Sequence, residues 1–115
     1  MRHKDLVILK KILSYCGECE EACLEFDNSF EKFSESSVFR NACCMCVLQI
    51  GELCKNISME LREESPQIPW RTWCGVRDIF AHQYSNLDIN VAWGTITEDI
   101  PMLKSEIRLL IEMDQ

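Results

Sequence analysis

The chain has 115 residues, of which 47% are hydrophobic and 27% are charged, a balance that predicts one domain with a single modest core. Its formal net charge of −7 argues against a broad nucleic-acid surface, because sequence-independent binding needs many lysines and arginines at the phosphates. No apolar run approaches the roughly 18 residues of a membrane span, and the first residues, M-R-H-K-D-L, do not resemble a signal peptide. We therefore expect a cytoplasmic protein without a membrane partner.

The first half of the chain predicts two long helices. From about Lys4 to Phe26, apolar residues recur at intervals of three and four, the spacing of one helix face. A turn follows, with a short helical turn across Ser29 to Phe33. A second helix is predicted from about Val38 to Leu61. Gly51 lies inside it and costs about 1 kcal/mol relative to alanine, so we expect another helix to approach closely there.

A loop from Arg62 to Pro69 separates these helices from a third. Proline favours the first position of a helix, and the third helix is predicted to run from there to about Tyr84. Five of its side chains are expected to point inward: Trp70, Trp73, Val76, Ile79 and Phe80. Trp70 and Trp73, three residues apart, share one face and are expected to anchor this helix in the core.

The last helix is predicted from about Ile89 to Met113, with Asp88 as its N-cap. Pro101 should kink or split it, because proline clashes with the preceding turn. Its buried side is expected to contain Val91, Trp93, Ile96, Ile100, Leu103, Ile107 and Leu110. No strand-like alternation occurs, so residues 1–115 predict a single all-α domain, an up-and-down bundle of four main helices, or five if Pro101 splits the last.

The eight cysteines allow three interpretations. Without a signal peptide, free thiols are expected rather than disulfides, and buried free cysteine packs as a small hydrophobe. Cys16 and Cys19 form a C-x-x-C pair that could be redox-active or provide half of a zinc site. We favour core packing, with no metal and no cofactor, because the other cysteines fall in helical patterns rather than in loops.

The third helix carries the residues best suited to chemistry. Arg77 offers a planar, permanently charged group that matches a phosphate. Five residues later, His82 can transfer a proton near neutral pH, and Tyr84 adds a hydroxyl. An amphipathic helix with an incidental histidine would explain the same residues, so the motif alone leaves both interpretations open.

The stretch G-V-R-D-I-F-A-H-Q-Y from Gly75 to Tyr84 resembles the Arg-x4-His-x-Tyr motif of HEPN domains, specifically HepT-like toxins. The resemblance covers nearly the whole chain, because Q-I-G-E-L (Gln49–Leu53), P-Q-I-P-W (Pro66–Trp70) and V-A-W (Val91–Trp93) follow the family's order and spacing. It implies a metal-independent endoribonuclease of a toxin–antitoxin pair, in which the RNA 2′-hydroxyl attacks the adjacent phosphorus. DNA is not an expected partner.

The resemblance also implies roles for individual residues. His82 would transfer the proton, and Arg77 would bind the phosphate and stabilise its transition state. Asp78 could orient either of them or be an exposed acid, and Glu52 could contact the cleft or be a solvated face residue. Tyr84 would accept AMP from a nucleotidyltransferase antitoxin, which would block phosphate access, or it could simply pack at the helix end.

Helical geometry raises a question about the site. His82 lies five residues after Arg77, about 140° around a straight helix, so the two side chains do not converge automatically. The family's symmetric dimer would resolve this by lining one cleft with two copies of the motif, and we expect a homodimer. The alternative function is a non-catalytic HEPN module that binds a partner nucleotidyltransferase.

Overall fold

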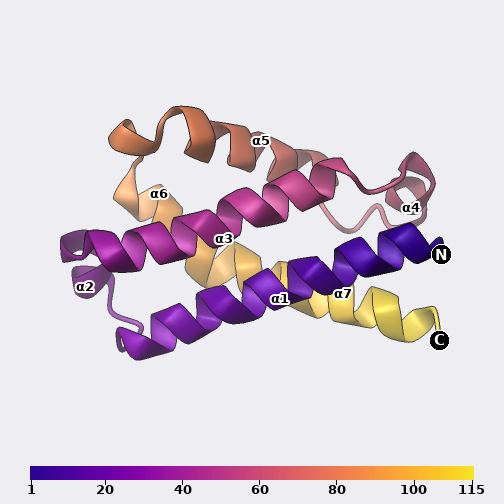
Figure 1. The fold of residues 1–115 in the computed structure, drawn as a ribbon, viewed down its shortest axis with the longest axis horizontal. Helices are drawn as coiled ribbons and strands as arrows, with labels where there is room; N and C mark the ends of the chain where they lie inside the picture. The colour runs from indigo at the N-terminus through magenta and orange to yellow at the C-terminus, as the bar shows by residue number, and fades with distance from the viewer.

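Four long helices build the structure, a computed structural model that describes residues 1–115. They are α1 (His3–Glu25), α3 (Ser37–Lys55), α5 (Trp70–His82) and α7 (Ile100–Met113). Helix α3 lies between α1 and α5, and α7 runs beside α1 (Figure 1). The predicted all-α bundle of four main helices is confirmed.

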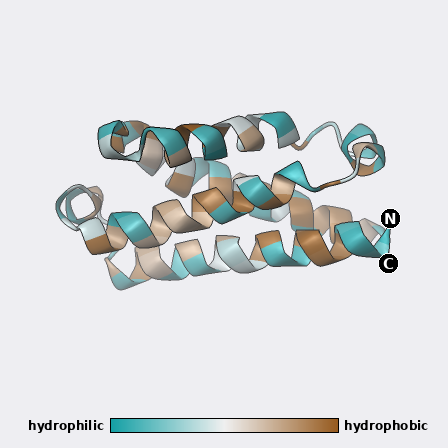
Figure 2. Cartoon of the chain, turned by 45° about the horizontal axis from the view of Figure 1, so that its top comes forward, coloured by the Kyte–Doolittle hydropathy of each residue, from teal (hydrophilic) through white to brown (hydrophobic).

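Hydrophobic and hydrophilic residues alternate around the long helices (Figure 2), as expected when each helix buries one face. The core contains 25 buried residues, among them Trp70, Trp73 and Phe80. Seven of the eight cysteines are buried as free thiols, and Cys74 is half-buried. None of the helices combines the length and apolar character that a membrane crossing requires.

The turn after α1 follows the prediction. Asp27 and Asn28 adopt positive φ angles of 60° and 51°, which these residue types tolerate better than most. Ser29 then caps α2 (Phe30–Glu35) by accepting a hydrogen bond from the Lys32 N–H. The reversal allows α3 to return antiparallel to α1.

The predicted end of the second helix is wrong. Helix α3 ends at Lys55, and a separate helix α4 (Met59–Glu64) follows. The break is held by Ser58, whose hydroxyl caps α4 through the Leu61 N–H at 3.1 Å. Ser58 also donates its N–H and O–H to the buried carboxylate of Asp5, at 3.0 and 2.6 Å. This contact joins residues 53 positions apart, so helical periodicity could not predict it.

The last predicted helix forms as one helical run. Asp88 caps α6 (Ile89–Gly94) as expected, a π turn η2 (Thr95–Asp99) follows, and α7 continues to Met113. Pro101 does not split the run. It sits in the first turn of α7, and the wider turn before it accommodates a residue that cannot donate to the helical ladder.

Two expected core residues lie on the surface. Ile79 is 49% exposed and Val91 is 60% exposed, so both predictions are wrong. Each precedes the residue that points inward, Phe80 or Ala92, and one residue turns a helix by about 100°. The apolar spacing in these segments did not indicate which of the two adjacent residues would be buried.

Candidate active site

Arg77 lies where α5 crosses α3 most closely. A Cβ atom on Gly51 would be 2.2 Å from the Arg77 Cβ and 2.8 Å from the Trp73 carbonyl oxygen. Only glycine leaves room for this approach. The expectation that Gly51 marks a close helix crossing is confirmed, and the residue brought to the crossing is Arg77.

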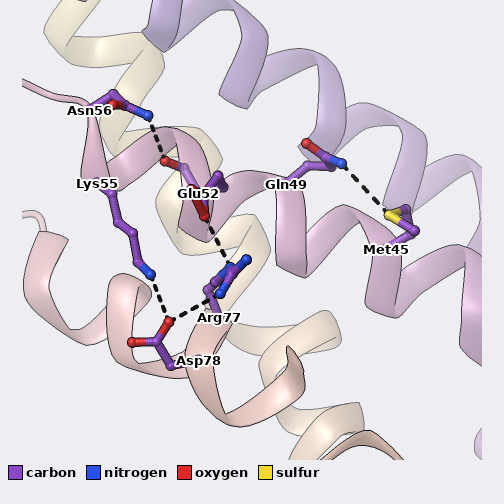
Figure 3. A network of polar contacts seen from close by, with 7 residues as sticks. All are labelled: Met45, Gln49, Glu52, Lys55, Asn56, Arg77 and Asp78. Carbon is purple, nitrogen blue, oxygen red and sulfur yellow. Dashed lines mark hydrogen bonds and ion pairs between the residues drawn. The ribbon is translucent and has the colours of Figure 1, made fainter. Parts of the chain in front are cut away.

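The side chain of Arg77 enters a polar network between α3 and α5 (Figure 3). Its Nε lies 3.1 Å from Oε2 of Glu52, an ion pair in which the N–H is not aligned for a hydrogen bond. Its Nη1 donates to Oδ1 of Asp78 at 3.3 Å, and Nζ of Lys55 donates to the same oxygen at 2.7 Å. Glu52, Asp78 and Arg77 are therefore brought together, with Lys55 added.

The network carries two positive and two negative side chains, so it is close to neutral. The hydrogen bond from Lys55 is the main reason that the pKa of Asp78 is lowered, with Arg77 contributing less. Asp78 consequently stays ionised at neutral pH. A substrate phosphate would compete with Glu52 and Asp78 for Arg77, whose side chain is 30% exposed.

His82 is the last residue of α5 and is exposed. Five helical residues place it about 7.5 Å further along the axis than Arg77 and about 140° around it. The helix continues as far as His82, so it does not unwind early enough to turn the two side chains toward each other. Helical geometry therefore does not by itself bring the Arg77 guanidinium and the His82 imidazole together within one chain.

Tyr84 follows the end of α5 in the short 3₁₀ turn η1 (Tyr84–Asn86). Its hydroxyl donates to Oδ1 of Asn41 on α3. Because Asn41 lies ten residues before Gly51, roughly 15 Å along α3, Tyr84 and Arg77 contact opposite halves of that helix. Burial raises the pKa of the Tyr84 phenol, and the positive charge of Arg40 lowers it by a smaller amount.

Two hollows flank the Tyr84 ring, and Asn41 and Cys44 line both of them. One, of about 430 Å³, also reaches Met45 and Phe80. The other, of about 370 Å³, contains Arg40. The cation beside Tyr84 in the same chain is therefore Arg40 and not Arg77.

Sequence reasoning missed three residues of this region: Arg40, Asn41 and Lys55. All three are on α3, and no spacing in the sequence connects them to the motif on α5. Only the antiparallel pairing of α3 with α5 brings them near Asp78 and Tyr84.

The C-x-x-C pair does not act as a unit. Cys19 instead groups with Cys23 and Cys43, whose sulfur atoms all lie within 4.8 Å of one another, and Cys16 is outside that group. Burial raises the pKa of the Cys16 thiol to about 12, so this residue remains a protonated core side chain.

Comparison with known proteins identifies relatives of the whole chain. The family model "Ribonuclease HepT-like" matches residues 12–110. A probable ribonuclease HepT of Thermococcus cleftensis is 35% identical over 103 residues, covering 88% of this chain and 94% of that protein. A putative RNase of Methanocaldococcus jannaschii is 33% identical over 104 residues, covering 90% and 88%.

A longer relative also matches. The gamma-glutamylcyclotransferase and putative RNase of Methanocaldococcus jannaschii is 34% identical over 110 residues, which is 93% of this chain but half of that protein's length. No solved structure matches the chain.

Proposed function

The chain belongs to the HepT-like ribonuclease family, and on this premise we propose that it is the toxin of a toxin–antitoxin pair that cleaves RNA without a catalytic metal ion. The observation that carries the proposal is the placement of Arg77 and His82 on α5. Arg77 is held at a helix crossing by Gly51, and His82 is open to solvent at the helix end. A fixed phosphate-binding group and an accessible proton carrier are what the reaction needs.

The proposed reaction uses the RNA as its own nucleophile. The 2′-hydroxyl oxygen attacks the adjacent phosphorus, the bond to the 5′-oxygen breaks, and a 2′,3′-cyclic phosphate and a 5′-hydroxyl result. His82 takes the 2′-hydroxyl proton or supplies one to the leaving oxygen. Arg77 binds the phosphate and stabilises the charge that grows on it. Glu52 and Asp78 orient Arg77 until the phosphate arrives.

A homodimer would bring a second copy of the motif to the same cleft. The arrangement of α5 supports this, since Arg77 and His82 do not converge within one chain. Ile79 lies between them in the sequence and exposes 49% of its surface, an apolar side chain that a two-fold partner would cover. We expect a mass of twice 13.4 kDa by light scattering, and Ile79→Glu should yield a folded, inactive monomer. An active wild-type monomer at micromolar concentration would contradict the shared site.

Tyr84 is the proposed point of control by a nucleotidyltransferase antitoxin. Its phenolic oxygen would attack the α-phosphorus of ATP, pyrophosphate would leave, and the phenolic proton would pass to the partner enzyme. The hollow beside Tyr84 that contains Arg40 offers a cation for the new phosphate. AMP at this position would stand two residues from His82 and obstruct the approach of RNA.

A second function is favoured by the charge balance around Arg77. Glu52 and Asp78 already neutralise it, and the whole chain carries a net charge of −7. A non-catalytic module that binds a nucleotidyltransferase would need no free arginine. Such a module would bind its partner equally well after Arg77→Ala and would cleave no RNA.

Expression of the chain alone tests the two functions. We expect slowed growth and RNA cleavage that persists in EDTA, and both should be lost in His82→Ala with unchanged thermal unfolding. Tyr84→Phe keeps the ring but removes the nucleophilic oxygen, so it should remain toxic while escaping AMP transfer. If His82→Ala is as toxic as the parent, the catalytic proposal fails. If Tyr84→Phe is still modified, only the control mechanism fails.

A further inference from the structure

Three cysteines meet at the interface between α1 and α3, on the face of α3 opposite to the motif helix α5, and a fourth lies one helical turn further along α3. The sulfur atoms of Cys19, Cys23 and Cys43 all lie within 4.8 Å of one another. Cys46 is outside that group and lies three residues after Cys43, on the same face of α3. All four are buried and free.

The spacing of these residues explains how they converge. Cys19 and Cys23 are four apart on α1, and Cys43 and Cys46 are three apart on α3, so each pair lies on one face of its helix. The two faces oppose each other because α1 and α3 pack together. Two helical pairs therefore bring their thiols to one interface without any loop, and three of the four sulfur atoms form a close group. The sequence alone did not suggest this arrangement.

The distances between the three grouped sulfur atoms are short enough for a metal ion to bind after a small adjustment. A zinc–sulfur bond of about 2.3 Å requires ligand sulfurs roughly 3.8 Å apart in a tetrahedral site. Sulfurs within 4.8 Å need to move by at most about 1 Å to reach that geometry. Rotation about a single side-chain bond per cysteine supplies such a movement. Core packing alone needs no sulfur and would be served equally by aliphatic side chains.

The cluster also has a route to solvent. A surface hollow of about 230 Å³ has Cys23 in its wall, next to Glu20, Asn28 and Thr97. Thr97 belongs to the π turn η2, and single π turns are frequent at functional sites.

From these observations we propose that Cys19, Cys23 and Cys43, with Cys46 as the fourth ligand from the next turn of α3, form a closed thiolate site for one thiophilic d¹⁰ ion, Zn²⁺ or Cu⁺. Each ligating thiol releases its proton to solvent as the metal–sulfur bond forms, with no oxidation. The ion would fasten the C-terminal half of α1 to α3, and it has no part in RNA cleavage. The site replaces the sequence-based expectation of cysteines that serve only as packing.

The first test uses the reduced wild-type chain, stripped of metal and titrated with Zn²⁺ and, separately, with Cu⁺ under nitrogen. One ion per chain should bind with at least one of the two, and thermal unfolding should shift upward. Alkylation followed by mass spectrometry should show protection of the four cluster cysteines by the ion. Cys16 and Cys54, equally buried but outside the group, should show no additional protection. No binding of either ion, or uniform protection of all cysteines, would overturn the site.

Variants provide the second test. Cys23→Ala and Cys43→Ala should each weaken metal affinity by roughly 100-fold or more, while Cys16→Ala and Cys54→Ala leave it unchanged. If a cluster variant does not fold, the alkylation pattern of the wild-type chain still tests whether these cysteines bind the ion. Binding that survives in Cys23→Ala and Cys43→Ala would refute the assignment, as would protection that appears only on oxidation and without metal. RNA cleavage is not a readout in either test, so failure here leaves the proposed function intact.

Discussion

Replacement of Gly51 by alanine is the most direct perturbation of the helix crossing that positions Arg77. The added Cβ would lie 2.2 Å from the Arg77 Cβ and 2.8 Å from a backbone oxygen. Non-bonded carbon atoms prefer about 3.5–4.0 Å, so α3 and α5 must separate by more than about 1 Å. Neither clashing atom is at the free end of a flexible side chain, so the strain cannot be relieved locally.

The expected magnitude follows from two opposing terms. Overpacking of this kind costs about 3 kcal/mol, the upper end of the usual range, and alanine returns about 1 kcal/mol of helix propensity. We expect Gly51→Ala to lower the free energy of unfolding by about 2 kcal/mol. The displaced Arg77 should also reduce RNA cleavage.

Two other helical glycines provide matched controls. A Cβ on Gly17 or on Gly75 would meet nothing within 4 Å, so each alanine variant should gain about 0.5–1 kcal/mol. Urea unfolding of the three variants measures the contrast, with midpoints expected to move in opposite directions. If Gly51→Ala is as stable as Gly75→Ala, the close crossing does not exist as described and the positioning of Arg77 must be reconsidered.

Two further predictions concern the polar contacts that fix α4 and the network. Ser58→Ala removes the hydroxyl that caps α4 and donates to the buried Asp5 carboxylate, and leaves the backbone N–H donor in place. It should cost about 2–4 kcal/mol in urea unfolding. Ser29→Ala removes only a surface cap and should cost about 1 kcal/mol; equal losses would contradict the Asp5 contact. Because the pKa of Asp78 is lowered in the folded chain, its stabilisation is present at neutral pH and lost on acidification. The stability difference between wild type and Asp78→Asn should therefore shrink as the pH falls below about 4, and a difference independent of pH would refute this origin.

Much of the fold was predictable because the information is local. The apolar spacing of α1, the N-cap at Asp88 and the turn at Asp27 each depend on residues within a few positions of one another. Gly51 was also informative, since glycine in a long helix requires a close neighbour as compensation. The sequence could not identify that neighbour as Arg77, which lies 26 positions later.

Ile79 and Val91 show that the local apolar pattern does not always predict which residue is buried. Each is apolar and stands next to a residue that is truly buried, and a rotation of about 100° decides which of the two faces the core. That rotation is set by the partner helix and not by the residue's own chemistry. The break between α3 and α4 is likewise set by a distant residue, because Asp5 near the start of the chain accepts a hydrogen bond from Ser58.

The sequence by itself determined the helices, the motif on α5 and the internal position of the cysteines, because periodicity, capping and residue chemistry act over short distances. The tertiary structure decided which side chains meet. Antiparallel pairing of α3 with α5 placed Glu52 and Lys55 at Arg77 and Asp78, and placed Arg40 near Tyr84. Packing of α1 against α3 gathered Cys19, Cys23 and Cys43. Such encounters depend on the register between distant helices, which no local pattern encodes.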